Sequence, residues 1–209
     1  MKRRYLSRIN FQALSIAVIL GGTQWAYAGA VRYQPQDIAS DCVTVWEQGL
    51  SSCDTHPDTY VVVRKKARAL AWCESGRLVK VFEVGLGFSP SGDKQQEGDG
   101  QTPLGTFYIP RRLPASQFYR AFLISYPDKE DAEQGRRRGT ISSWQYNAIV
   151  EAQDKCREPP QKTSLGGFIE IHGRGGATDW TLGCVAINDT EIDQLWRTLD
   201  VGDTVVILP

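Results

Sequence analysis

The chain has 209 residues, of which 41% are hydrophobic and 23% charged, and its 24 basic residues balance its 24 acidic ones. This is the composition of an ordinary globular protein, and it excludes collagen-like, coiled-coil and intrinsically disordered chains. There is also no basic excess that would draw the chain onto nucleic acid, so we expect no nucleic-acid partner.

Residues 1–28 have the features of an export signal. The segment opens with Lys2-Arg3-Arg4 and Arg8, continues as an apolar stretch over 11–20, and ends with the small-residue signature Ala26-Tyr27-Ala28. We expect cleavage after Ala28, which leaves 20 basic against 24 acidic residues. The apolar stretch is shorter than the ~20 residues that a membrane span requires. We therefore expect no stable membrane insertion after cleavage.

Strand signals dominate the rest of the chain, taken in order. Residues 29–58 predict a small N-terminal appendage closed by a disulfide. Residues 59–72 favour a strand, which turns at 74–76 into a returning strand over 77–84. The turn-rich segment 89–100 follows as a loop. Further strands are expected over residues 106–109, 122–126, 168–171 and 204–208.

Helical signals are fewer and shorter. Residues 128–138 predict a polar, partly helical insertion, and Ser142 or Ser143 is a cap for a helix that ends by Pro159-Pro160. Residues 189–199 predict a capped helix with one apolar face. Because strands and helices do not alternate regularly, a doubly wound parallel sheet is disfavoured. The pattern indicates a mostly-β fold with short helices, built as a sandwich or a barrel-like core.

The two histidines differ in their surroundings. His56 lies in a polar turn, where we expect no function. His172 follows the apolar run 168–171 and precedes a glycine-rich turn, so the scaffold holds it with one side exposed. Cys184 lies twelve residues later, behind Gly183. A glycine there lets a substrate approach closely and can aim consecutive N–H groups at one point, as an oxyanion site requires.

A neighbouring imidazole can take the proton of a thiol and so activate it as a nucleophile. The pair His172 and Cys184 is therefore an acyl-transfer arrangement. On spacing alone, a hydrogen-bonded strand-end histidine and a core or disulfide-bonded cysteine remain as alternatives.

The sequence motifs of other catalytic and binding sites are absent. Two separated histidines without a C-x-x-C pair do not make a zinc site, and no dinucleotide loop, phosphate loop or serine-hydrolase elbow is present. We expect no metal and no cofactor.

These segments resemble a known family. Ile171-His172-Gly173, followed by Thr181-Leu182-Gly183-Cys184-Val185, is similar to the His-Gly and Ser/Thr-x-Gly-Cys signature of the L,D-transpeptidase catalytic domain, or YkuD-type domain. Residues 98–107 resemble the family's Gly-Asp-x-x-Thr-Pro-x-Gly segment, and residues 79–87 and 165–172 resemble its strands. The resemblance covers residues 59–209, which we expect to be the catalytic domain of a β-rich enzyme.

The resemblance implies a role for each matching residue. Cys184 would be the nucleophile and His172 its base. Gly183 and Cys184 would supply oxyanion N–H groups, the Gly173 carbonyl would orient His172, and Thr181 would line the substrate pocket. Two positions depart from the family pattern, because Leu182 stands where many members have His and Ala186 where many have Arg or Asn. The contact to the substrate carboxylate is then expected from Arg174 or Arg197.

The implied activity is that of a periplasmic cysteine L,D-transpeptidase of cell-wall peptidoglycan. In this family the cysteine attacks a tetrapeptide stem, D-Ala leaves, and the acyl group passes to an amine. The acceptor stays open between another stem peptide, a lysine of an outer-membrane lipoprotein, a free D-amino acid and water. The alternatives are an L,D-carboxypeptidase, a hydrolase of the wall–lipoprotein link, and a non-catalytic wall-binding protein.

Five cysteines follow the export signal, and an oxidising compartment favours disulfides among them. The role implied for Cys184 requires a free thiol, so the other four are expected to pair with each other. Of the three possible connectivities we favour Cys42–Cys53 together with Cys73–Cys156.

Overall fold

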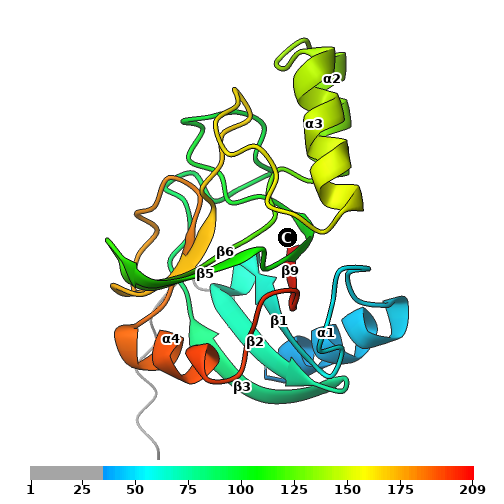
Figure 1. Cartoon of the computed structure of the whole chain (residues 1–209). Helices are drawn as coiled ribbons and strands as arrows, with labels where there is room; N and C mark the ends of the chain where they lie inside the picture. The colour runs from blue at the N-terminus through cyan, green and yellow to red at the C-terminus, as the bar shows by residue number, and fades with distance from the viewer. Residues whose placement is uncertain (1–34) are drawn as a thin grey trace, which may run out of the picture. The chain divides into compact units, whose positions relative to one another are not determined.

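Two β-sheets form the centre of the computed structural model, which describes residues 35–209 (Figure 1). The predicted export signal and its cleavage site lie outside the described residues. The five-stranded sheet has the order β3-β2-β1-β9-β4, with β1 Thr59–Arg64, β2 Ala69–Glu74, β3 Arg77–Glu83, β4 Gly105–Tyr108 and β9 Thr204–Leu208. The four-stranded sheet has the order β5-β6-β7-β8, with β5 Arg111–Ser116, β6 Tyr119–Leu123, β7 Glu170–His172 and β8 Val185–Ala186.

The five-stranded sheet is mixed. Strands β1, β2 and β3 follow one another as antiparallel neighbours, whereas β1 pairs with β9 in parallel. Both β1 and β9 are interior strands of this sheet, with neighbours on each side. A strand that is covered on both faces carries a continuous apolar run instead of an alternating one. This position explains why residues 61–63 and 205–207 are uninterrupted Val and Ile.

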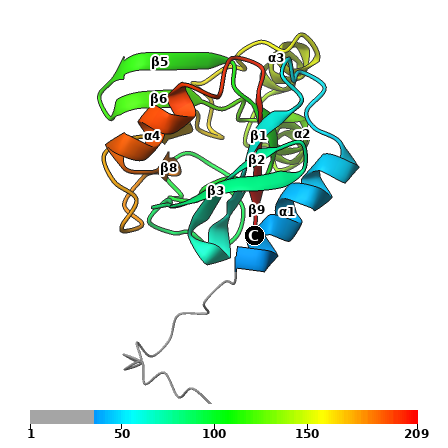
Figure 2. The same ribbon diagram turned by 90° about the horizontal axis from the view of Figure 1, so that it is seen from below.

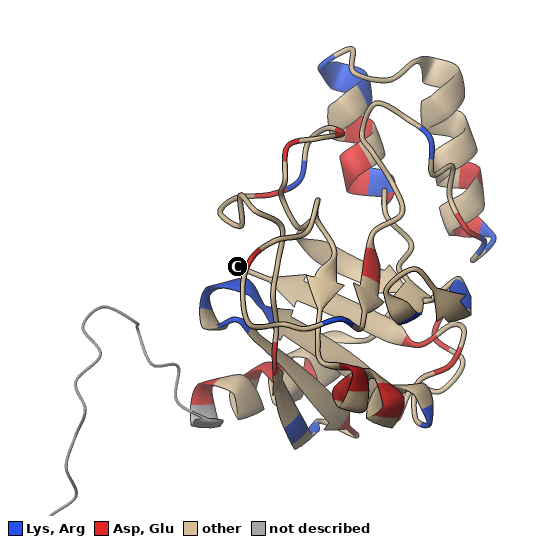
Figure 3. Ribbon diagram, turned by 90° about the vertical axis from the view of Figure 1, so that its left-hand side faces the viewer, with Lys and Arg blue, Asp and Glu red and all other residues tan. Residues whose placement is uncertain are grey.

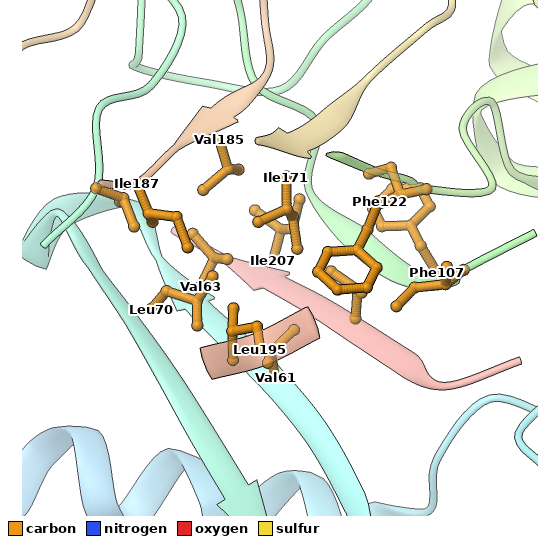
Figure 4. Close-up of a cluster of buried hydrophobic side chains, with 14 of the residues drawn as sticks. Val61, Val63, Leu70, Phe107, Phe122, Ile171, Val185, Ile187, Leu195 and Ile207 are labelled. Carbon is orange, nitrogen blue, oxygen red and sulfur yellow. The ribbon is translucent and has the colours of Figure 1, made fainter. Parts of the chain in front are cut away.

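The main hydrophobic core lies on one face of the five-stranded sheet. Val61, Val63 and Leu70 contribute to it from that sheet, and Phe122 and Ile171 from the other (Figure 4). Because successive residues of a strand point to opposite faces, the residues between them belong to a second core under the first helix. That second core includes Tyr60, Val62, Ala71, Cys73 and Val206.

Four helices surround the sheets. Helix α1 (Pro35–Gln48) lies along the outer face of the five-stranded sheet, and α4 (Asp189–Trp196) lies beside β6 (Figure 2). Helices α2 (Lys129–Arg137) and α3 (Ser143–Asp154) form a hairpin that projects beyond the sheets and carries charges of both signs (Figure 3). None of these helices, over residues 35–209, is long and apolar enough to cross a membrane.

The predicted fold class is confirmed in its main features. The chain forms mixed sheets with a few short helices, and the two sheets do not close into a barrel. The capped helices expected near Ser142 and residue 189 are present, the first with Ser142 as its cap. The single strand predicted over 59–72 is wrong. It is two strands, because residues 65–67 form a short 3-10 helix and Arg68 adopts a left-handed conformation, which reverses the chain.

The predicted disulfide pairing is also wrong. The bonds are Cys42–Cys73 and Cys53–Cys156, and Cys184 is the free cysteine of the described residues, as expected. The reason is helix α1, which the sequence analysis did not predict. It packs across the sheet and brings Cys42 to a Cα–Cα distance of 5.8 Å from Cys73. Cys53 instead reaches the end of the α2–α3 hairpin, at 5.4 Å from Cys156.

Candidate active site

The register between β7 and β8 brings the two candidate catalytic side chains to one face of the four-stranded sheet. The strands run in parallel, with Ile171 opposite Val185 and His172 opposite Ala186. Ile171 and Val185 both point into the main core. Since side chains alternate along a strand, His172 and Cys184 point to the opposite face. The short loop between the strands thus returns Cys184 to the neighbourhood of His172.

Both side chains line the same cavity, which has a volume of about 1040 Å³. Its wall combines parts of the chain that are distant in sequence: the loop at 94–98, residues 117–118, Gln145 of α3, and residues within 161–169 and 180–184. The glycine-rich loop before β4 and the α2–α3 hairpin therefore both contribute to the surroundings of Cys184. This cavity is the site where His172 and Cys184 can meet a substrate.

His172 is held firmly in its place. The expectation that one side of it is exposed is wrong, because two aromatic rings cover it. The ring is fully buried and stacks on Phe118, with 4.3 Å between ring centroids, while Trp180 contacts it edge-on at 5.6 Å. Its Nδ1–H donates to the Gly173 carbonyl oxygen at 2.6 Å. Burial lowers the pKa of His172, so the imidazole is neutral at neutral pH. Its Nε2 has no hydrogen-bond partner among the described residues, and with the proton on Nδ1 it is available as a base.

The Cys184 thiol lies beside the backbone of β7. Its sulfur accepts the Glu170 N–H at 3.4 Å, and the S–H donates to the Phe168 carbonyl oxygen at 3.5 Å. Burial raises the pKa of Cys184 to about 12, against a smaller opposing effect of the Lys94 charge. The resting site is therefore a neutral thiol beside a neutral imidazole. Such a thiol requires a base to remove its proton during the attack.

The turn before Cys184 is organised by Thr181. Its hydroxyl donates to the Cys184 carbonyl oxygen at 2.8 Å and accepts the Gly183 N–H at 3.1 Å. Gly183 has φ +135°, and a Cβ on it would lie 2.7 Å from the Gln101 carbonyl oxygen, so only glycine fits there. The expectation for the oxyanion donors changes accordingly. The Gly183 N–H is committed to Thr181, and the Cys184 N–H is the donor that remains.

The structure does not place the expected arginines in the cavity wall. Arg174 is exposed in the turn after β7, where its own N–H donates to Asp189, and Arg197 is exposed at the end of α4. Two lysines lie in the wall instead, Lys94 and Lys162. The sequence analysis missed both. One sequence feature could have indicated Lys94. It lies five residues before Asp99 of the Gly-Asp segment, close enough to form an ion pair with that aspartate.

A second, open cavity of about 490 Å³ adjoins the first. The two share Gln145, Phe168 and part of the segment 161–163, and the second extends toward the exposed Trp144 at the start of α3. The two cavities together extend from Cys184 to the start of α3, next to the turn that joins α2 and α3. Among the described residues, no group of three or more His, Cys, Asp or Glu side chains could hold a metal ion.

Comparison with known proteins identifies this architecture. The family model of the L,D-transpeptidase catalytic domain, YkuD, matches residues 58–207. No significant match was found among curated protein sequences.

Solved structures are similar to this chain at low sequence identity. Bd1075 from Bdellovibrio bacteriovorus is 20% identical, with a TM-score of 0.50 over 77% of this chain and 51% of that one. The helical cell shape determining protein Pgp2 from Campylobacter jejuni is 22% identical, with a TM-score of 0.47 over 83% and 56%. An L,D-transpeptidase from Xylanimonas cellulosilytica is 15% identical, with a TM-score of 0.43 over 71% and 59%.

This chain spans between half and three-fifths of the length of these solved chains. The family assignment does not depend on them, because the family model alone covers 150 of the 209 residues. It agrees with the motifs that carried the resemblance in the sequence. The chain belongs to the L,D-transpeptidase catalytic domain family.

Proposed function

We propose that the protein is an exported cysteine L,D-transpeptidase that acts on the tetrapeptide stems of peptidoglycan. Membership of the family supports an enzyme that modifies peptidoglycan. The observation that carries the proposal is the pairing of a free Cys184 with a His172 whose Nε2 has no partner in the described structure, both on the wall of one cavity. A protein that only binds the cell wall has no use for this pair.

In the first half-reaction, Nε2 of His172 takes the proton of the Cys184 thiol as the sulfur attacks the carbonyl carbon on the L-centre of diaminopimelate. The Cys184 N–H stabilises the oxyanion that forms. Collapse of this intermediate breaks the peptide bond, and the proton on His172 passes to the departing amine of D-Ala. A thioester between Cys184 and the stem remains.

In the second half-reaction, an amine attacks the thioester carbonyl and loses a proton to His172. The proton then returns to the Cys184 sulfur as the thiol leaves. The Gly173 carbonyl keeps the ring in the correct tautomer throughout, and Thr181 holds the turn that carries Cys184. The neutral resting state suits this cycle, since neither group must first be charged or discharged.

We assign the protein to the periplasm, with residues 1–28 as the cleaved signal. The basic and apolar pattern of that segment supports export, and the two disulfides suit an oxidising compartment. Peptidoglycan stem peptides are then the donor substrate. A lysine of an outer-membrane lipoprotein is one of the acceptors to be tested, beside a second stem and a free D-amino acid.

The test incubates residues 29–209 with disaccharide-tetrapeptides and identifies the products by mass. Cross-linked dimers establish transfer between stems, and tripeptide without dimer establishes hydrolysis by the same residues, as in an L,D-carboxypeptidase. Supplying a lipoprotein peptide or a D-amino acid tests the other acceptors. Cys184→Ala is the matched control and should leave the substrate unchanged. An unchanged substrate with the wild-type protein would contradict the proposal and favour a binding protein.

A further inference from the structure

Lys94 is a buried cation in the wall of the active-site cavity. Its side chain is only 2% exposed, yet it lines the cavity together with His172 and Cys184. Burying an ammonium group is unfavourable unless it is paired and hydrogen-bonded. The other lysine of this wall, Lys162, is exposed and makes no ion pair in the part of the chain that the structure describes. Lys94 is thus the cation that the fold itself builds into the wall.

The partners of Lys94 leave it part of its hydrogen-bonding capacity. The ammonium donates to the Asp99 carboxylate at 2.8 Å and to the Gln96 carbonyl oxygen at 3.0 Å. An ammonium has three donors, so one N–H remains. The Asp99 carboxylate also accepts the backbone N–H groups of Gln95, Gln96 and Gln101. The Asp99 carboxylate is thus held by four donors, of which Lys94 is the only charged one.

The charge of Lys94 is felt at Cys184. It acts on the thiol in the direction that favours the thiolate, while the Glu170 carboxylate acts more strongly in the opposite direction. Gly166 packs beside this side chain, where a Cβ would lie 3.2 Å from Lys94 Cε and 3.6 Å from Nζ. The absence of a side chain at Gly166 leaves room for Lys94 in the cavity wall. Lys94 is therefore placed to contact a group bound next to Cys184.

The proposed substrate carries a suitable anion at that distance. In a stem that ends in D-Ala, the terminal carboxylate is attached to the carbon that follows the scissile nitrogen. When the scissile carbonyl lies at the Cys184 sulfur, this carboxylate must lie within a few atoms of it. Arg174 and Arg197 do not line the cavity, and Glu97, the acidic residue of the wall, would repel a carboxylate.

We propose that Lys94 binds the terminal carboxylate of the leaving D-Ala and so selects stems with a free carboxyl end. The proposal rests on the function proposed above. Charge-assisted hydrogen bonds to carboxylates are among the stronger ones, so loss of this contact should weaken turnover by about 10- to 100-fold. Lys94 takes the place of the Arg or Asn that many relatives carry two residues after the cysteine, where this chain has Ala186.

The experiment must distinguish binding of the substrate carboxylate by Lys94 from a purely structural role of Lys94 in the loop. The chain offers a matched control in Lys65, a second buried lysine that donates to the carbonyl oxygens of Gly92 and Thr102 at the base of the same loop. Lys65 does not line the cavity. Substituting either lysine removes one buried charge that contacts the loop, but only Lys94 can lose a substrate contact.

The experiment measures kcat/KM for D-Ala release from two stems, one with a free terminal carboxylate and one with the carboxamide. The wild-type protein should prefer the carboxylate by about 10-fold or more. In Lys94→Gln the preference should disappear through a loss on the carboxylate stem alone. Lys65→Gln and Lys162→Gln should retain it. Lys94→Arg, which keeps the positive charge, should also retain the preference for the carboxylate stem. This variant keeps the proposal testable if Lys94→Gln fails to fold.

Binding of both stems to the Cys184→Ala protein and to its Lys94→Gln derivative is measured in parallel by calorimetry. If the Cys184→Ala protein binds the carboxylate stem more tightly than the carboxamide stem, and Lys94→Gln abolishes this difference, then Lys94 recognises the carboxylate. This conclusion holds even if the wild-type protein turns over neither stem, since that result would refute only the proposed reaction. Equal losses on both stems in Lys94→Gln, no preference in the wild type, or loss of the preference in Lys162→Gln alone would each overturn the role of Lys94.

Discussion

At the scale of single residues, the proposed catalytic pair is neutral at rest. Burial acts on both partners, raising the pKa of Cys184 and lowering that of His172. Each shift favours the uncharged form, in contrast to a thiolate–imidazolium ion pair. The base must be unprotonated to act, and His172 becomes protonated only below its ordinary pKa of 6.5. In the proposed reaction, protonation of His172 is thus expected to set the acid side of the pH–activity profile.

We therefore expect kcat/KM to fall on the acid side only below pH 6.5, with no decline between pH 8 and pH 6.5. The resting thiol should also react with iodoacetamide more slowly at pH 7.5 than a free cysteine does, because little of it is thiolate. Rates across a pH series and mass-detected alkylation measure both effects. An acid limb above pH 7 together with rapid alkylation would indicate an ion pair and contradict this description.

Thr181 provides a second test at this scale. Thr181→Val keeps the shape of the side chain but leaves the Gly183 N–H and the Cys184 carbonyl without their partner. We expect a loss of about 1–3 kcal/mol in the free energy of unfolding and a fall in kcat of about 10-fold, since the turn that carries the nucleophile loosens. Thr181→Ser is the matched control and should stay close to wild type. A larger effect of Thr181→Ser than of Thr181→Val would show that the methyl group, not the hydroxyl, matters.

At the scale of elements, the start of α2 depends on two carboxyl groups. Asp128 caps the helix and accepts the Asp131 N–H at 2.9 Å, and Asp131 in return accepts the Asp128 N–H at 3.0 Å. Burial and the nearby Asp128 raise the pKa of Asp131 far above that of a free carboxyl group. A raised pKa means that the folded state binds the proton more tightly than the unfolded state. This stabilisation is complete below the ordinary pKa near 3.8 and is lost as the pH rises toward the folded value.

The unfolding temperature of the wild-type protein should accordingly fall between pH 5 and pH 9 by more than that of Asp131→Asn. The amide keeps an acceptor for the Asp128 N–H and cannot ionise. Asp131→Ala, which also cannot ionise but lacks the acceptor, should be about 1 kcal/mol less stable than Asp131→Asn at every pH. Thermal unfolding followed by circular dichroism measures all three proteins. Parallel pH curves for wild type and Asp131→Asn would show that Asp131 is ionised in the folded state.

Elements differ in how well the sequence predicts them, and the differences have physical causes. Strand β9 was predicted at its observed bounds, because a buried interior strand is a continuous run of Val and Ile. Strand β5 was missed, since it is an edge strand with an exposed, polar sequence that contains Pro114. Strand β8 has only two residues and exists through its pairing with β7.

Helix α1 did carry a signal that was not used. Ile38, Cys42 and Val45 recur at helical spacing and form its buried face. The sequence analysis instead interpreted Cys42 and Cys53 as the ends of a small disulfide-closed loop, and therefore did not predict a helix there. The motif around Cys184 and His172 was recognisable because it is local. The contribution of Lys94 was not, since it depends on a loop reaching the cavity from a distant part of the chain.

At the scale of the whole molecule, the two disulfides attach the N-terminal segment to different parts of the fold. Cys42–Cys73 fastens α1 to the five-stranded sheet and closes a loop of 31 residues. Cys53–Cys156 fastens the loop after α1 to the end of the α2–α3 hairpin and spans 103 residues. In the chain-entropy model the longer loop restricts the unfolded chain more, with contributions of about 4.7 against about 3.7 kcal/mol.

We therefore expect the double variant Cys53→Ser with Cys156→Ser to lose more stability than Cys42→Ser with Cys73→Ser, by about 1 kcal/mol in chemical unfolding. The longer bond also ends just after α3, at the opposite end of this helix from Gln145 and five residues before Gln161, which lies in the cavity wall. Its removal should lower kcat/KM while Cys184 stays alkylatable, whereas removal of Cys42–Cys73 should leave kcat/KM near wild type. The reverse order in both measurements would mean that α1, and not the hairpin, determines the shape of the cavity.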